Sequence, residues 1–200
     1  MHIMWFTERQ YHYDPETEPA RSRLLENQIL RNRSFFGLPN ENFDAQQGSM
    51  LLNEYLDEKI YSEDLGFDGL MLNEHHGTPF CLGSVMDVEA AVLAKATKKA
   101  KIVLLGNPLP LAENPVRLAE ELAMIDMISK GRLVSGFVRG GGQEQLANGV
   151  NPAFNRERFE EAHDLVVAAW SREVRDQAGS DRVARCCEDD RDDGCRLLRR

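Results

Sequence analysis

A glutamate followed by two histidines stands at the end of an apolar run, and these side chains are well suited to acid–base chemistry. Residues 67–72 lead through Asn73 into Glu74, His75 and His76. An imidazole titrates near neutral pH, and a neighbouring carboxylate fixes its tautomer and raises its basicity. Side chains alternate along an extended backbone, so the two rings point in opposite directions. This argues against a metal centre, for which H-x-H would place both rings on one face. One histidine could touch a ligand, or both could be structural.

Two further apolar runs end in residues with functional potential. Residues 102–105 lead into Gly106, Asn107 and Pro108, and residues 133–138 lead into Arg139 and three glycines that begin at Gly140. The amide of Asn107 could hydrogen-bond a polar ring or a substrate, although Asn and Pro also favour ordinary turns. The glycines could let the backbone after Arg139 approach a planar or anionic ligand. A flexible loop with a solvated arginine is the alternative.

Segments with helical periodicity separate the apolar runs. We expect helices over about 50–64, 84–99, 114–130 and 156–170, and a short one over 21–29 in the polar connection 8–49. Gly66 suits a helix C-cap, and Asn114 before a proline suits an N-cap. The apolar positions expected to share one side are Val85, Val88, Ala91, Val92 and Ala96 in the second helix, and the inward-facing ones in the third are Leu118, Leu122, Ile125 and Met127.

This alternation of strands and helices predicts a parallel sheet covered by helices, because the strands are continuous apolar runs. The strand ends near residues 74, 107 and 139 are 33 and 32 residues apart. A (β/α)8 TIM barrel of about 250 residues has eight units of about 31 residues. No G-x-G-x-x-G motif follows the first strand, which argues against a dinucleotide-binding sheet. We therefore predict an α/β fold of TIM-barrel type, with about the first four βα units present.

Bulk properties narrow the class of protein. The chain has 200 residues, a net charge of −9 and 42% hydrophobic residues, which is enough for one core. An acidic balance argues against nucleic acid as a partner, and no apolar window is long enough for a membrane span. The N-terminus does not resemble a secretory signal, so we expect a cytoplasmic protein. The cysteines fit no zinc spacing, and we expect no metal site.

The last thirty residues differ in composition from the rest. Residues 171–200 hold eight arginines, no lysine and no periodic apolar face. We expect residues 1–170 to form the N-terminal half of a barrel, and residues 171–200 to be a disordered or out-of-frame tail.

Several segments resemble the bacterial luciferase-like monooxygenases, in the order and at the spacing of that family. They are GFDG at residues 66–69 with NEHH at 73–76, NPVRLAEE at 114–121, IDMISKGRL at 125–133 and GFVRG at 136–140. The resemblance implies a TIM barrel that binds reduced FMN at its C-terminal mouth and uses O2 to oxygenate a small organic substrate. The flavin carries the hard chemistry, and the protein positions it and excludes water.

The resemblance also assigns roles. It implies that His75 is the catalytic acid–base residue, and that Glu74, Asn107, Arg139 and Gly140 belong to the cofactor site. It implies a separate NAD(P)H:flavin reductase as the source of reduced FMN, and a homo- or heterodimer. Alternatives are a deazaflavin (F420)-dependent oxidoreductase of the same fold and a non-catalytic, truncated subunit. Because barrels commonly bind phosphate after strands seven and eight, we expect four units alone to bind FMN weakly or not at all.

Overall fold

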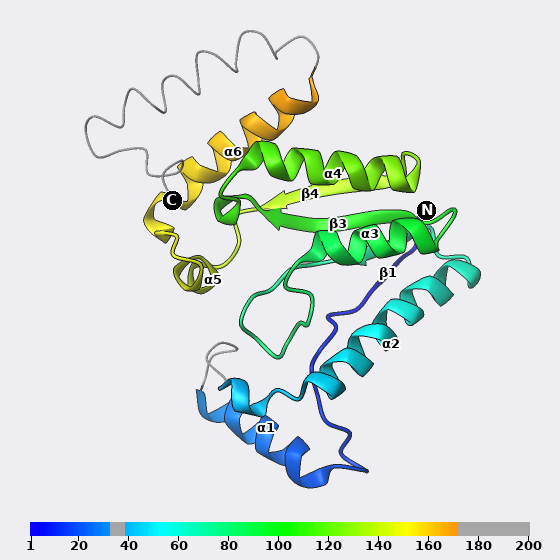
Figure 1. Cartoon of the computed structure of the whole chain (residues 1–200), viewed down its shortest axis with the longest axis vertical. Coiled ribbons are helices and arrows are strands. Elements are labelled where there is room, and N and C mark those ends of the chain that lie inside the picture. Colours follow the sequence, from blue (N-terminus) through cyan, green and yellow to red (C-terminus); the bar gives the residue numbers. More distant parts are fainter. Residues whose placement is uncertain (33–38, 172–200) are drawn as a thin grey trace. The chain divides into compact units, whose positions relative to one another are not determined.

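The computed structural model describes residues 1–32 and 39–171, and the tail predicted for residues 171–200 therefore lies almost wholly outside it (Figure 1). The described chain forms two compact units. The first contains residues 1–107 and 125–136, and the second contains residues 108–124 and the chain from Phe137 onward.

The sheet has the order β1-β2-β3-β4, which follows the sequence. Its strands are β1 (Met4–Phe6), β2 (Gly69–Leu72), β3 (Lys101–Pro108) and β4 (Leu133–Val138). β1 pairs parallel with β2, and β2 pairs parallel with β3. Figure 1 shows β4 running in the same direction beside β3. A parallel sheet in sequence order, with a helix in each crossover, is the arrangement of a partial TIM barrel, as the sequence predicts.

Helices occupy the connections between the strands. They are α1 (Pro19–Asn32), α2 (Ala45–Asp64), α3 (Met86–Ala96), α4 (Pro115–Ser129), α5 (Gly142–Ala147) and α6 (Asn155–Trp170), with 3-10 turns at Asn40–Asn42, Leu109–Leu111 and Pro152–Phe154. The predicted helices are all present, and α2 begins five residues earlier than predicted. The sequence patterns do not predict α5 or the 3-10 turns, which are only three to six residues long.

Capping residues explain where the helices begin and end. Asp44 accepts hydrogen bonds from the backbone N–H groups of Gln46 and Gln47, which sets the start of α2. Asn114 does the same for Val116 and Arg117 at the start of α4. Gly66 has a φ of 90°, a left-handed conformation that favours glycine after a helix. The two predicted caps, at Gly66 and Asn114, are confirmed.

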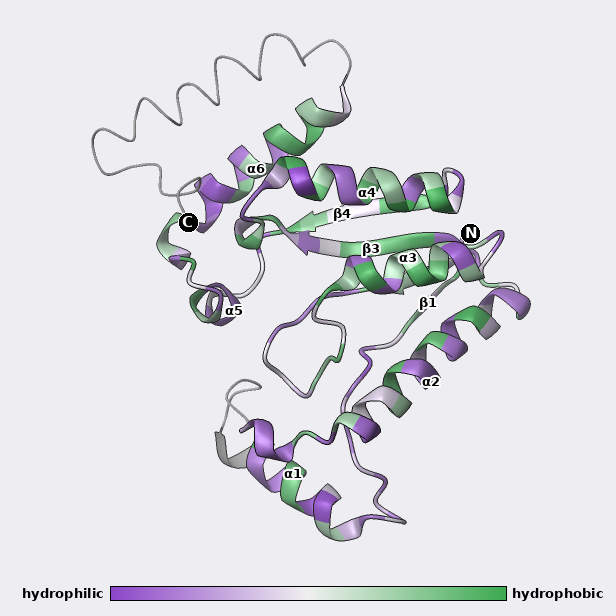
Figure 2. Cartoon of the chain, viewed as in Figure 1, coloured by the Kyte–Doolittle hydropathy of each residue, from purple (hydrophilic) through white to green (hydrophobic). Residues whose placement is uncertain are grey.

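In the part of the chain that the structure describes, one face of the sheet is buried and the other is partly exposed. Leu70, Leu72, Ile102 and Leu104 are at most 2% exposed. Side chains alternate in a strand, so the intervening residues share the opposite face. On that face Phe6 is 40% and Leu105 is 39% exposed. Figure 2 shows that β3 and β4 are largely apolar along their length. Among the described residues, this apolar face of the sheet in the first unit is therefore only partly covered.

The packing face of α3 differs from the predicted one. In α3 the buried side chains are Met86, Glu89, Ala90, Leu93 and Ala94. The predicted side of α3 is solvent-exposed at Val85, Val88 and Val92. α3 is apolar around most of its circumference, so periodicity alone cannot select the buried side.

In α4 the buried apolar residues are Ala119, Leu122 and Ile125. Met127 is 71% exposed, so its predicted inward position is wrong. It lies two residues beyond Ile125, and residues two apart lie on different sides of a helix.

The polar connection before α2 has its own apolar cluster within the first unit. Tyr11, Tyr13, Leu25 and Leu51 are buried together. The rings of Tyr11 and Tyr13 meet edge-to-face, with 5.5 Å between their centroids. This cluster ties α1 to the start of α2. It gives the long connection 8–49 a packed structure in its described residues.

The second unit is built around α6. Leu109, Ala119, Ala162 and Val166 form its buried cluster. The indole N–H of Trp170 donates a hydrogen bond to the carbonyl of Ala119 at 3.0 Å, which fastens the last turn of α6. Ala162 and Val166 are the buried positions of α6.

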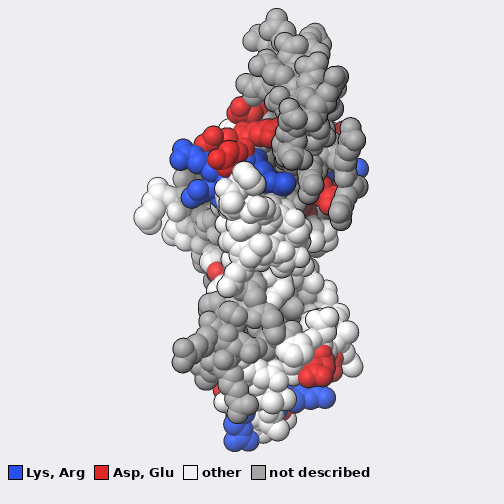
Figure 3. All heavy atoms as spheres, turned by 90° about the vertical axis from the view of Figure 1, so that its left-hand side faces the viewer, with Lys and Arg blue, Asp and Glu red and all other residues white. Residues whose placement is uncertain are grey.

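Charged side chains of both signs share the surface. On the face drawn in Figure 3, the described Lys and Arg side chains lie among Asp and Glu. Arg117 forms an ion pair with Glu121 at 2.8 Å, and a similar pair joins Arg156 to Glu160 at 2.8 Å. Within the residues that the structure describes, no helix combines the length and apolarity needed to cross a membrane.

Candidate functional site

Glu74 ties together the segment that follows β2. Its Oε1 lies 3.1 Å from Nε2 of His76. Its Oε2 accepts a hydrogen bond of 2.9 Å from the backbone N–H of Met86, the first residue of α3. The side chain of Glu74 is only 12% exposed, which strengthens both interactions. The carboxylate therefore orients one imidazole and anchors the segment to the positive end of a helix.

His75 is held differently from His76. Its backbone N–H donates to the carbonyl of Gly83 at 3.4 Å. Its ring meets Phe80 edge-on, with 5.8 Å between the ring centroids. The imidazole is partly buried, and an aromatic neighbour limits its rotation. His75 is thus a restrained titratable group at the carboxyl end of β2.

Asn107 is a buried amide whose nitrogen has no hydrogen-bond partner. The residue is 4% exposed, and its Nδ2 has no partner among the described residues. Leu72 of β2 is in register with Leu104 of β3, and both His75 and Asn107 lie three residues further on. Along β3, Asn107 shares the face of Val103 and Leu105, which is partly exposed at Leu105 and buried at Asn107 itself. A buried amide donor left unpaired costs about 1–3 kcal/mol.

Arg139 and Gly140 follow β4 and belong to the second unit. Both residues are exposed. Gly140 has a φ of 72°, so a side chain there would be strained. The fully buried Gln145 donates to the Arg139 carbonyl at 2.6 Å, which fixes this turn. The structure thus places Glu74, His75 and Asn107 in the first unit, at the carboxyl ends of neighbouring strands. It places Arg139 and Gly140 in the second unit.

A buried charged cluster next to Asn73 was missed by the sequence analysis. Arg9 and Lys59 are completely buried and Glu89 is 5% exposed. Nε of Arg9 lies 3.0 Å from Oε2 of Glu89. The Sγ of the free Cys81 lies 3.3 Å from Nη2 of Arg9. Glu89 lies at helical spacing from the buried apolar residues of α3, and this spacing is the one sequence feature that indicates its burial. No sequence pattern indicates the burial of Arg9 or Lys59.

Burial dominates the electrostatics of this cluster. It lowers the pKa of Lys59 to about 8, and the positive charge of Arg9 adds to the effect. Burial raises the pKa of Glu89, against the opposing influence of Arg9. Burial also raises the pKa of the Cys81 thiol, which makes it a poor nucleophile. Among residues 1–32 and 39–171, no group of three His, Cys, Asp or Glu side chains is arranged to hold a metal ion.

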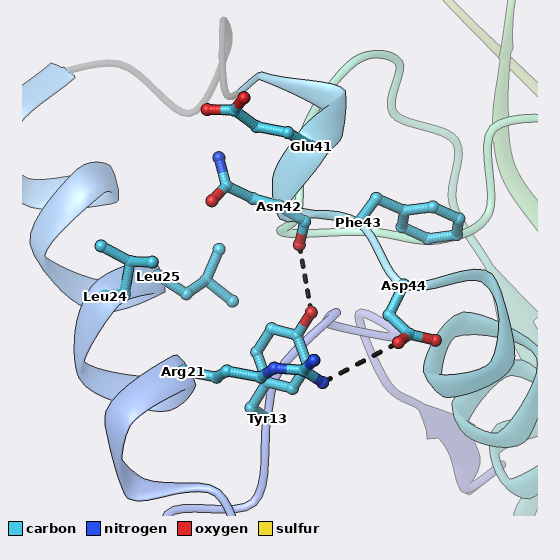
Figure 4. A pocket seen from close by; sticks show the side chains of 8 residues that line it. All are labelled: Tyr13, Arg21, Leu24, Leu25, Glu41, Asn42, Phe43 and Asp44. Carbon is cyan, nitrogen blue, oxygen red and sulfur yellow. Dashed lines mark hydrogen bonds and ion pairs between the residues drawn. The ribbon is translucent and has the colours of Figure 1, made fainter.

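A separate hollow lies between α1 and the start of α2 (Figure 4). The Tyr13 hydroxyl donates to the carbonyl of Asn42 at 3.3 Å, and Arg21 pairs with Asp44 at 3.8 Å. None of the predicted site residues lines it, so it plays no part in the argument for the site. Its lining residues are Tyr13, Arg21, Leu24, Leu25, Glu41, Asn42, Phe43 and Asp44.

A parallel α/β sheet in sequence order, with Glu74, His75 and Asn107 after neighbouring strands, is the arrangement of a partial TIM barrel. The family model of the luciferase-like monooxygenases matches residues 34–187, which is more than half of the chain. The chain belongs to this family. The match runs past residue 170, where the sequence analysis predicts the barrel segment to end.

Curated relatives match over shorter stretches. The alkanal monooxygenase alpha chain of Photorhabdus luminescens is 46% identical over 79 residues, which is 40% of this chain and 22% of the relative. The beta chain of Vibrio harveyi is 35% identical over 105 residues, covering 51% of this chain and 32% of the relative. The chain thus spans less than one third of the length of these relatives.

Solved structures agree with the fold. The monooxygenase RslO1 from Streptomyces bottropensis superimposes with a TM-score of 0.56 at 30% identity, covering 60% of this chain and 36% of that one. The oxygenating constituent of 3,6-diketocamphane monooxygenase from Pseudomonas putida, solved in complex with FMN, gives a TM-score of 0.56 at 20% identity. It covers 65% of this chain and 36% of that one, and at this identity it supports the fold alone.

Proposed function

We propose that this chain contributes the flavin-facing carboxyl edge of a monooxygenase that uses reduced FMN and O2 to oxygenate a small organic substrate. One oxygen atom goes to the substrate and the other leaves as water, while reduced FMN supplies two electrons and two protons and is released oxidised. A separate NAD(P)H:flavin reductase would supply the reduced cofactor. Membership of the luciferase-like family supports this reaction class.

The observation that carries the proposal is the unpaired amide of Asn107. A flavin ring presents carbonyl and ring-nitrogen acceptors along one polar edge. The buried Nδ2 of Asn107, which has no partner in the described protein, is suited to donate to such an acceptor. A polar group that destabilises the free protein and pairs with a ligand is common at functional sites. The residues of this edge therefore fit a planar, hydrogen-bonding cofactor.

Each remaining site residue has a proposed part in this arrangement. His75, restrained by Phe80, would hold or move a proton at its imidazole. Glu74 would contribute by keeping the segment and His76 in place. In the second unit, considered by itself, Arg139 would supply positive charge for a cofactor, and Gly140 would let the backbone approach a ligand closely, as its left-handed conformation permits.

Asn107→Leu tests the proposal, because leucine has nearly the same shape and lacks both polar atoms. Removing an unpaired buried donor should raise the melting temperature of the chain. The same change should weaken FMN binding by about fivefold, the equivalent of about 1 kcal/mol for one hydrogen bond. Thermal unfolding of the purified chain measures the first effect. Quenching of flavin fluorescence, at FMN concentrations high enough to detect the weak binding expected of four barrel units, measures the second.

Asn53→Leu serves as the matched control, because Asn53 is an exposed amide on α2. It should leave FMN affinity unchanged. Oxygen uptake with chemically reduced FMN then checks the reaction class, and His75→Gln should reduce substrate-dependent uptake. Equal FMN affinity in wild type and Asn107→Leu would contradict the proposed role of Asn107. Hydride transfer to F420 without oxygen uptake would instead identify the deazaflavin alternative.

A further inference from the structure

Arg9 follows β1 and lies entirely inside the first unit. Its backbone has a φ of 57°, a conformation that few non-glycine residues adopt. Its guanidinium has no solvent exposure and forms an ion pair with Glu89 of α3, whose side chain is 6% exposed. A strained backbone that delivers a buried charge requires compensation from the surrounding structure.

The guanidinium holds the residue that precedes the Glu74-His75-His76 segment. Its Nη1 donates to Oδ1 of Asn73 at 2.8 Å, and its Nη2 donates to the Asn73 carbonyl at 2.5 Å. The Nδ2 group of Asn73 donates in turn to Glu8, the neighbour of Arg9. The chain just after β1 therefore fixes both the backbone and the side chain of the residue just after β2.

Arg9 also contacts the other end of the loop, through its backbone as well as its side chain. The backbone N–H of Leu82 donates to the Arg9 carbonyl at 2.8 Å, and the Gly83 carbonyl accepts from the N–H of His75. A Cβ at Gly83 would lie 2.0 Å from Nη2 of Arg9 and 2.4 Å from Oε1 of Glu89. Only glycine fits there while the pair is in place. Arg9 and Glu89 thus hold the two ends of the segment that carries His75.

Stability alone explains this arrangement poorly. A buried ion pair is often no more stabilising than apolar residues of the same volume. The buried Lys59, whose Nζ has no hydrogen-bond partner among the described residues, contributes a further positive charge to the same interior. Rigid support, by contrast, is what a catalytic side chain requires, since a displacement of about 1 Å can reduce activity about a hundredfold.

We propose that Arg9, through its ion pair with Glu89 and its clamp on Asn73, is a positioning residue that sets the orientation of His75. The identity of the ligand that His75 would contact, a flavin, rests on the proposed function. The clamp itself is independent of it, because it is defined by contacts within the first unit. Arg9 is not a catalytic residue, since its guanidinium is buried against protein groups.

The test replaces the pair by apolar residues in the double variant Arg9→Met/Glu89→Leu. Histidine ring resonances in the NMR spectrum, with that of His75 assigned from His75→Gln, report its surroundings without any flavin. The double variant should remain folded, while the His75 resonance shifts or splits into several conformers. FMN affinity should fall by about tenfold, similar to the smaller losses seen when supporting residues are removed from metal sites.

Two single variants separate positioning from general stability. Arg9→Lys keeps the charge but cannot hold Asn73 and Glu89 at once. Its His75 resonance should therefore be shifted from the wild-type position, as in the double variant. Gly83→Ala should disturb the same resonance by pushing the pair apart. Gly142→Ala is its control, because the nearest atom to that Cβ would be 3.7 Å away.

Outcomes for the clamp and for the flavin are distinguishable. A shifted His75 resonance in all three variants supports the positioning role even when none of the proteins, wild type included, binds FMN, in which case the proposed function fails alone. A His75 resonance that stays unchanged in the folded double variant overturns the positioning role. A change that merely follows the fraction of unfolded chain overturns it as well.

Discussion

Replacing Lys59 by methionine should stabilise the protein, because this lysine carries a positive charge in the buried interior, where the charged form is poorly solvated. It lies in α2 with no solvent exposure, and its Nζ has no hydrogen-bond partner among the described residues. Burial, with Arg9 as the second cause, lowers its pKa from 10.5 to about 8. Methionine has a similar length and carries no charge.

The size of the effect follows from the pKa. At about 1.4 kcal/mol for each pKa unit, the difference between 10.5 and about 8 corresponds to a penalty on the order of 3 kcal/mol at pH 7. Lys59→Met removes this penalty. For a chain of this length the gain corresponds to a rise in Tm of about 6–12 °C.

The pH dependence gives the sharper test. Between pH 8 and 10.5 the unfolded chain keeps the Lys59 proton that the folded chain releases, so this lysine makes wild-type stability rise with pH. Below pH 8 both states are protonated and the penalty is fully present. The difference in unfolding free energy between Lys59→Met and wild type should therefore be largest at pH 7 and shrink toward pH 10.

Urea unfolding at several pH values measures this difference directly. Lys95→Met is the control, since Lys95 is exposed on α3 and should show little change. A difference that does not vary between pH 7 and pH 10, or a variant less stable than wild type at pH 7, would refute the reasoning about Lys59.

Two further predictions concern the first unit. Although burial opposes it, hydrogen bonds from the backbone N–H groups of residues 98–100 hold the pKa of Glu63 below its ordinary 4.5. Glu63→Gln should therefore cost about 1 kcal/mol in urea unfolding at pH 7, and the difference should shrink as the pH falls below about 4.5; a constant difference would contradict this. In Gly136→Ala the new Cβ would lie 2.6 Å from the Leu104 carbonyl oxygen, so thermal unfolding should show a loss of about 1–3 kcal/mol, absent from Gly142→Ala.

The sequence predicted the order of the elements because local signals determine it. Continuous apolar runs mark buried parallel strands, and Gly66 and Asn114 mark helix ends through their own backbone and side-chain chemistry. The candidate residues Glu74, His75 and Asn107 were found for the same reason, since the carboxyl ends of strands can be read from the runs that precede them.

The buried sides of the helices and the charged cluster depended on tertiary contacts. Val88 and Leu93 are both apolar, and only packing decides that the first is exposed and the second buried. Arg9 and Lys59 are charged residues in polar or amphipathic stretches, where exposure is the normal expectation. Their burial depends on partners far apart in sequence, so no local pattern could reveal it.

The close contact of Arg9 and Glu89 with Gly83 also has an evolutionary consequence. An arginine at position 9 and a glutamate at position 89 are useful only together, because each neutralises the buried charge of the other. A glycine at position 83 is required only while both are present. Lineages that lost one member should have relaxed the other two, so the three positions should be inherited as a set. Family members without the pair must then support the segment after β2 by different contacts, and this loop could diverge among them while the strands stay the same.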